Sequence, residues 1–275
     1  MKVLKTTVSF LAATLVFASC TRDENPVQAE DQAISQEVID KVRSLNMNPE
    51  GMTLENVKLP DGTLETFYHL ETDIFMPPEQ LEAMVPDDVV ITEHYRYINV
   101  VNHPRTISVI GYTGGVNGLT ANMQTGLTWA VNNYNAVPGL TLTFTLTFAT
   151  STDADIVVYR DPATSGAGGA AGIPDTSGNP FKWLRLYAGL DNASNNVNEH
   201  VITHQMGHCI GMAHTDWENR ESCGSGGGGG SSTNVVYIPG TPTGFDPGSI
   251  WNACFDFSTT GEFNANDILA LQVLF

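Results

Sequence analysis

The chain has 275 residues, of which 41% are hydrophobic, and it contains 26 Gly and 14 Pro. This apolar content excludes a chain that is disordered throughout, and no collagen or coiled-coil repeat is present. The formal net charge of −18, from 12 basic and 30 acidic residues, argues against nucleic acid and anionic membrane surfaces as partners. Four Cys are too few for a disulfide scaffold.

The first 20 residues have the features of a targeting segment. Two Lys precede an apolar run over residues 8–18, and small residues then lead to Cys20. This pattern predicts an export signal, and the run is too short to stay in the bilayer as a helix. A Cys directly after small residues resembles the bacterial lipoprotein box, although an ordinary signal peptide cut near Ser19 is the alternative. We expect residues 1–20 to be a lipoprotein-type signal peptide.

Lipidation would then fall on Cys20, and the lipid anchor would be the chain's contact with the membrane. The expected location is the outer membrane or cell surface, with release to the exterior as an alternative. Residues 21–90 are interpreted as a polar tether followed by a small prosegment-like region. Within this region, helical spacing predicts a helix over 35–45 with Ser35 as N-cap, and residues 66–70 form a candidate strand.

The remainder, residues 91–275, has the pattern of a mixed sheet with helices packed on it. The expected elements are strands over 106–110, 140–148, 155–159 and 181–187, the last at a sheet edge; helices over 119–137 and 267–274; and a Gly/Ala loop over 165–172. The fold class is therefore α+β.

One segment carries the spacing of a metal site. His204 and His208 are four residues apart, so on a helix their imidazoles share one face and both can bind one Zn²⁺. Gly211 can end that helix in the left-handed conformation, and the reversed chain can then present His214 as a third ligand. Three His ligands leave a fourth position open, as in catalytic zinc sites. We expect one Zn²⁺ per chain.

The run from His204 to His214 resembles the metzincin signature HExxHxxGxxH, and the longer run HQMGHCIGMAHTDW resembles the bacterial dual-action HEIGH metallopeptidases. The similarity extends over residues 90–275 and more weakly over 34–90. It implies a metzincin-like zinc peptidase domain at 91–275, with a mixed twisted sheet, a backing helix and a zinc-binding active-site helix. It also implies peptide-bond hydrolysis by zinc-activated water, with peptides or proteins as substrates.

Two positions depart from this family pattern. Gln205 occupies the general-base position, where the family has a Glu that accepts a proton from the zinc-activated water. Gln can form a hydrogen bond with that water but cannot accept its proton, so we expect activity to be weakened or lost while zinc binding is retained. Trp251 occupies the position of the Met-turn, the hydrophobic floor beneath the zinc ligands.

Three further assignments concern residues around the site. Asp216, close after His214, is either a carboxylate partner of a ligand imidazole or a surface acid. Asp73 is placed like the Asp of the astacin Gly-Asp prosegment motif, with Thr72 in place of Gly, and is a candidate latency ligand; a surface acid is the alternative. For the cysteines, the Cys223–Cys254 pair and the Cys209–Cys254 pair both remain open.

Two functions follow from these features. The first is a zinc metallopeptidase-family protein of the cell surface or exterior whose activity Gln205 has weakened or removed. The alternative is a catalytically inactive zinc-binding surface lipoprotein that binds peptides or protein partners. The pattern makes no prediction of oligomeric state.

Overall fold

The computed structural model describes residues 34–275 except 46, 86–94, 217–219, 225–235 and 243–244. The signal segment with Cys20, the tether over 21–33 and the expected domain boundary at 90/91 therefore lie outside the described residues. The helices are α1 (Gln36–Ser44), α2 (Pro78–Ala83), α3 (Ala121–Ala136), α4 (Asn195–Ile210) and α5 (Ala265–Leu274). The strands are β1 (Thr53–Lys58), β2 (Leu64–Leu70), β3 (Ile74–Met76), β4 (Tyr95–Arg96), β5 (Arg105–Tyr112), β6 (Leu142–Ala149), β7 (Ile156–Asp161), β8 (Gly169–Gly172), β9 (Trp183–Tyr187) and β10 (Val236–Tyr237).

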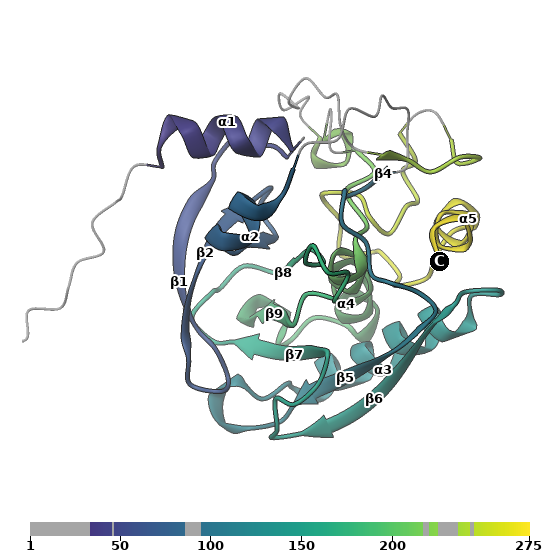
Figure 1. Ribbon diagram of the computed structural model, residues 1–275. Coiled ribbons are helices and arrows are strands. Elements are labelled where there is room, and N and C mark those ends of the chain that lie inside the picture. The colour runs from purple at the N-terminus through teal and green to yellow at the C-terminus, as the bar shows by residue number, and fades with distance from the viewer. Residues whose placement is uncertain (1–33, 46, 86–94, 217–219, 225–235, 243–244) are drawn as a thin grey trace, which may run out of the picture. The chain divides into compact units, whose positions relative to one another are not determined.

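Eight strands form one mixed sheet in the order β1-β2-β3-β8-β9-β7-β5-β6 (Figure 1). The strands from β9 to β6 are parallel, and the crossover helix α3 connects β5 to its parallel neighbour β6. β8 pairs with β9 in the antiparallel direction. The α+β class and the mixed sheet with a backing helix and a site helix are confirmed.

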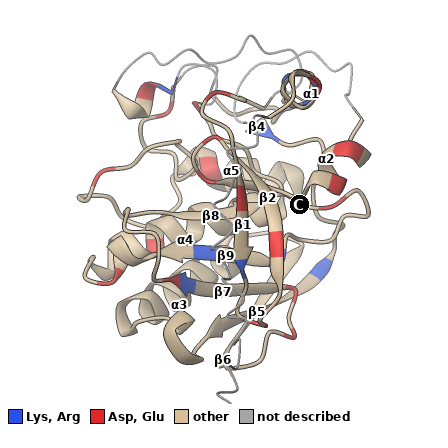
Figure 2. Ribbon diagram, turned by 90° about the vertical axis from the view of Figure 1, so that its left-hand side faces the viewer, with Lys and Arg blue, Asp and Glu red and all other residues tan. Residues whose placement is uncertain are grey.

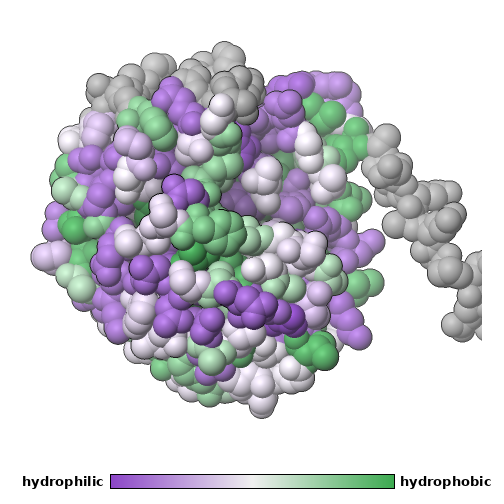
Figure 3. All heavy atoms as spheres, turned by 180° about the vertical axis from the view of Figure 1, so that it is seen from behind, coloured by the Kyte–Doolittle hydropathy of each residue, from purple (hydrophilic) through white to green (hydrophobic). Residues whose placement is uncertain are grey.

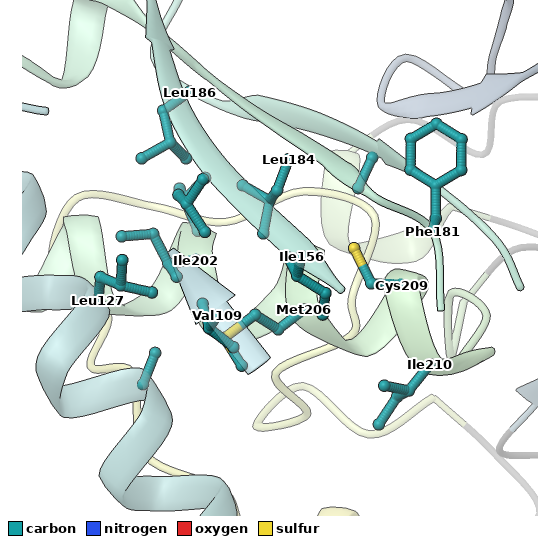
Figure 4. Packing of buried hydrophobic residues seen from close by; sticks show 14 of the residues in the cluster. Val109, Leu127, Ile156, Phe181, Leu184, Leu186, Ile202, Met206, Cys209 and Ile210 are labelled. Atoms are coloured by element: carbon teal, nitrogen blue, oxygen red, sulfur yellow. The ribbon is translucent and has the colours of Figure 1, made fainter. Parts of the chain in front are cut away.

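Helices α3 and α4 pack against each other and on the sheet, α3 against β6 and α4 against β8 and β9. The central residues of α4 belong to the hydrophobic core. Figure 4 shows Ile202 and Met206 of α4 among Val109 of β5, Ile156 of β7 and Leu184 of β9. These side chains are at most 1% exposed, so both helix and sheet depend on this contact.

The two helices approach closely at Gly126 of α3. A Cβ at this position would lie 2.7 Å from the backbone nitrogen of Glu199. Gly126 therefore permits the close crossing that fixes α4 over the sheet.

The expected helices are found at their predicted positions. Ser35 accepts a hydrogen bond from Val38 N–H as the N-cap of α1. The C-terminal helix α5 begins at Ala265, two residues before the expected start, because Asn264 and Asp267 form a capping box. The sequence patterns missed the short elements β1, β3 and α2.

Two expectations about the sheet are wrong. Residues 165–172 contain strand β8 rather than being wholly a loop, and β9 within 181–187 lies between β8 and β7 rather than at an edge. Small residues are required in β8 because its neighbours are close: a Cβ at Gly169 would lie 2.7 Å from the carbonyl oxygen of Arg185, and one at Gly172 would clash with the carbonyl oxygen of Phe75. The Gly and Ala composition hides the strand from a propensity-based prediction.

Residues 34–84 are joined to the rest through the sheet. β3 pairs with β8 in parallel, with Ile74 opposite Ala171 and Phe75 opposite Gly172. The hairpin β1–β2 continues the sheet beyond β3. Glu55 of β1 also forms a 3.0 Å ion pair with Arg185 of β9. The prosegment-like region therefore covers the edge of β8, one of the strands on which α4 packs.

The surface agrees with the acidic composition. Asp and Glu occur on many elements, whereas Lys and Arg are few (Figure 2). On the face seen from behind, hydrophobic residues form small patches among hydrophilic ones (Figure 3). In the described part of the chain, none of the helices combines the length and hydropathy required to cross a bilayer.

The Glu55 contacts predict a loss of stability in acid. A 2.7 Å hydrogen bond with His69 and the charge of Arg185 lower the pKa of Glu55 from 4.5 to about 2, against the opposing effect of burial. Because the folded-state pKa is lowered, the stabilisation is present above about pH 4.5 and is lost as the pH falls toward 2. Urea unfolding should show a shallower acid dependence for Glu55→Gln than for the wild type.

The exposed substitution Glu82→Gln is the matched control and should leave that dependence unchanged. Equal slopes for Glu55→Gln and the wild type would contradict the assignment.

Candidate metal centre

Helix α4 places two of the expected ligands on one face. Ser194 caps its first turn by accepting a hydrogen bond from Val197 N–H. Gly211 ends the helix with φ at +113°, in the left-handed region that favours glycine. A Cβ there would lie 2.7 Å from the carbonyl oxygen of Asn99. The chain then reverses and brings His214 beside His204 and His208, with ring centroids 4.5 to 5.2 Å apart.

Hydrogen bonds at Nδ1 orient all three imidazoles. The Nδ1–H groups of His204 and His208 donate to the carbonyl oxygens of Ile250, at 2.9 Å, and Met212, at 2.8 Å. His214 Nδ1 lies 3.1 Å from a carboxylate oxygen of Glu71. With protons on Nδ1, the lone pairs on the Nε2 atoms face one another. The Nε2 atoms of His204 and His208 are 2.8 Å apart.

Asp73 reaches the same point from the prosegment-like region. Its Oδ2 lies 3.0 Å from Nε2 of His204, 3.2 Å from that of His214 and 3.4 Å from that of His208. The preceding Glu71 and Thr72 have φ of +52° and +76°. This left-handed backbone is unusual for residues other than glycine, and it turns the Asp73 side chain inward. Asp73 is therefore buried at the metal centre rather than on the surface.

This donor set fits a divalent cation. The four ligand atoms lie within 4.8 Å of one another. Three lone pairs and a carboxylate facing one another would repel without a cation or extra protons between them. Asp73 Oδ1 is also buried without a hydrogen-bond partner among the described residues. Imidazole and carboxylate ligands in a four-coordinate arrangement are typical of zinc.

The same charges shift the pKa values of the side chains. Burial alone would raise the pKa of Asp73, but His214 and His208 hold it well below 3.8. Burial would lower the pKa of His214, yet the Asp73 carboxylate raises it to about 10. For His204, burial and the neighbouring His208 lower the pKa to about 4. The carboxylate thus draws positive charge into the cluster, in keeping with a cation site.

Gln205 lies beside the cluster, in contact with Asp73. It is 2% exposed, and its Nε2–H donates to Asp73 Oδ2 at 2.9 Å. Its Oε1 has no hydrogen-bond partner among the described residues. An amide, which cannot accept a proton, therefore faces the metal centre.

Trp251, the residue assigned to the floor of the site, packs against helix α4 at Gly207. Its side chain is fully buried, and its ring packs 5.6 Å from that of Phe263. The indole edge lies against Gly207, where any Cβ would clash with Nε1. Gly207 therefore makes room for Trp251 between the two histidines of α4, a role that its spacing in the sequence does not reveal.

A cavity of about 310 Å³ opens beside His204 and Gln205. Its walls come from the start of β8, the end of β9, α4 and the segment that follows Trp251, and Thr72 and Asp73 line one side. The larger lining side chains are Tyr187, His200, Val201, Phe255 and Phe257.

Asp216 is buried, but its described bonds go to the chain beside the cavity rather than to a ligand imidazole. Its carboxylate accepts hydrogen bonds from Ala253 N–H at 2.8 Å and Ser222 N–H at 2.9 Å. The carboxylate partner of His214 is Glu71 instead, which is 143 residues away in sequence. No local pattern links two residues so far apart.

The structure distinguishes between the two cysteine pairings that the sequence left open. Cys223 and Cys254 form a disulfide, and Cys209 is free and buried in α4. The disulfide adjoins the Asp216 contacts and secures the segment that forms one cavity wall.

The family model described as dual-action HEIGH metallo-peptidase matches residues 68–275. Two solved structures of myroilysin are similar: one at 16% identity covers 66% of this chain and 97% of its own, with a TM-score of 0.43. The other, at 15% identity, covers 71% and 95%, with a TM-score of 0.39. No curated protein gives a significant match.

The contact at Gly207 predicts a specific destabilisation. Gly207→Ala should lower the free energy of unfolding by about 1–2 kcal/mol, because overpacking costs about 1–3 and the better helix propensity of Ala returns up to about 1. Urea unfolding of both proteins measures the difference. In a Trp251→Met background the same substitution should cost less, since the indole is gone. An equal cost in both backgrounds would disprove the contact as the cause.

Proposed function

Because the chain belongs to the dual-action HEIGH metallopeptidase family, we propose that it is a zinc-binding metallopeptidase held latent by Asp73. We further propose that Gln205 weakens or abolishes its hydrolysis of peptide bonds. The observation that carries the proposal is the convergence of His204, His208, His214 and Asp73 on one point.

The three histidines would hold the zinc, which when bound supplies Lewis-acid activation of water for attack on a peptide carbonyl. The Nδ1 hydrogen bonds keep each ring in the tautomer that a metal requires. Gln205 can orient a nearby water through its amide but cannot remove a proton. Since general-base catalysis contributes about 10²–10⁴-fold, its loss supports a low rate.

Residues 34–84 support latency in two ways. Asp73 fills the fourth position around the histidines, where a catalytic site needs access for water. β3 also occupies the edge of β8, a strand edge to which an extended peptide could otherwise add. A peptide substrate would thus need this region to be displaced.

The cavity beside the metal centre supports a peptide ligand with a large apolar side chain. Tyr187, Val201 and Phe255 supply apolar contact area there. Pockets of this kind commonly receive one side chain of a bound ligand.

For location, we propose a lipoprotein of the outer membrane or cell surface anchored through Cys20. The support is the sequence alone: a charged start, a short apolar run and small residues before Cys20. The acidic, polar residues 21–33 would separate the folded unit from the bilayer.

A second function is favoured by the same two departures from the family pattern. Gln205 and Trp251 both lie at the metal centre, and the second proposed function is a zinc-binding surface lipoprotein that binds peptides or protein partners without cleaving them. Peptide binding without turnover would distinguish this function from slow proteolysis.

Zinc binding can be tested by metal analysis. We expect close to one zinc per chain in the wild type and its loss in His208→Ala, which removes one of three imidazole ligands. His200→Ala is the matched control, since His200 lies one helical turn before His204 and outside the cluster. Full zinc occupancy in His208→Ala would overturn the ligand assignment.

Restoring the general base tests the catalytic part. Gln205→Glu should raise turnover of a quenched casein substrate by at least about tenfold, less than the full value of a general base because Trp251 alters the floor of the site. Turnover is measured with and without chelator, in the full chain and in a chain beginning at Thr92, which lacks the covering region. Unchanged turnover with zinc bound would show that the site has lost more than its base.

A further inference from the structure

Gln205 has a hydrogen-bond partner that an ionised Glu at the same position could not have. Its Nε2–H donates to Asp73 Oδ2 at 2.9 Å, inside a buried site. The reverse amide orientation would place Oε1 against the carboxylate, so only this orientation is attractive. We propose that Gln205 is a positioning residue that holds Asp73, and with it the covering region, on the metal centre. This proposal rests on the proposed latency.

At this position Gln attracts the Asp73 carboxylate, whereas an ionised Glu would repel it. Replacing the amide by a carboxylate would place two acceptors 2.9 Å apart, which must repel or share a proton. An amide donor to a carboxylate is instead a charge-assisted hydrogen bond, stronger than a neutral one. The substitution that removes the general base therefore also favours the covered state.

Asp73 needs such contacts because the backbone turn that precedes it is unfavourable. Glu71 and Thr72 both have left-handed φ values, which cost free energy in residues other than glycine. Arg220 helps to hold this turn, since its guanidinium donates to the carbonyl oxygen of Glu71 at 3.1 Å. Beyond the turn, the backbone at position 73 is held by Ala171 N–H, which donates to Asp73 O at 3.0 Å. The side-chain contacts of Asp73 must offset the cost of the turn.

The hydrogen bond from Ala171 provides a local measure of this state. Hydrogen exchange at the Ala171 amide reports opening of the segment around Asp73. In the full chain, we expect Gln205→Glu to speed this exchange by about tenfold or more, because a hydrogen bond to a charged group is lost and repulsion is added. Gln205→Met, which removes the donor without adding charge, should give a smaller increase.

Two further variants separate positioning from a general structural effect. In an Asp73→Ala background, Gln205→Glu should cause no additional increase, because its partner is absent. The combination Asp73→Asn with Gln205→Glu should slow exchange again relative to Gln205→Glu alone, because the new amide can donate to the new carboxylate. Exchange at Val109 in the central strand β5 monitors global folding in every variant.

The proposal is overturned if Gln205→Glu and Gln205→Met both leave Ala171 exchange unchanged. It is equally overturned if Gln205→Glu accelerates exchange to the same extent without Asp73. Measuring exchange with and without zinc keeps this outcome distinct from the proposed function, whose failure would appear as missing zinc or missing turnover.

Discussion

Mutual repulsion of lone pairs is the constraint on which this structure depends. Three imidazoles are each committed at Nδ1 to an oxygen acceptor, which leaves their Nε2 atoms facing one another. Such an arrangement is stable only with positive charge at its centre. The surrounding elements produce this arrangement. Helix α4 supplies two of the imidazole rings, and the turn at Gly211 brings in the third. The carbonyl groups of Ile250 and Met212 set the tautomers of His204 and His208.

Close backbone approach makes that arrangement possible. Glycine allows α3 to pack against α4 at residue 126, the indole of Trp251 to lie against α4 at residue 207, and the chain to reverse at residue 211. The small residues of β8 allow β3 to pair along its edge. In each case a missing side chain, rather than an added contact, permits the geometry.

The sequence predicts the fold class, the metal-binding helix and the place of the three histidines, because these depend on local spacing along one helix and its C-cap. It also identifies Asp73 as a candidate through motif position. It does not reveal that Glu71 is the partner of His214 or that Trp251 packs against Gly207, since each contact joins residues distant in sequence. Strand β8 is not predicted because its close neighbours require small residues, and a run of Gly and Ala has the composition of a loop.

The contact between Glu71 and His214 gives the covering region a second consequence. Release of residues 34–84 would remove Asp73 and, in the same step, the carboxylate that orients His214 and increases the basicity of its ring. Uncovering the site would thus remove one metal ligand, Asp73, and weaken another, His214. The covered chain is accordingly the form better suited to acquire its metal from a dilute source, and the uncovered chain the form more vulnerable to losing it to competing chelators. If residues 34–84 are displaced as proposed, metal loading would precede that step.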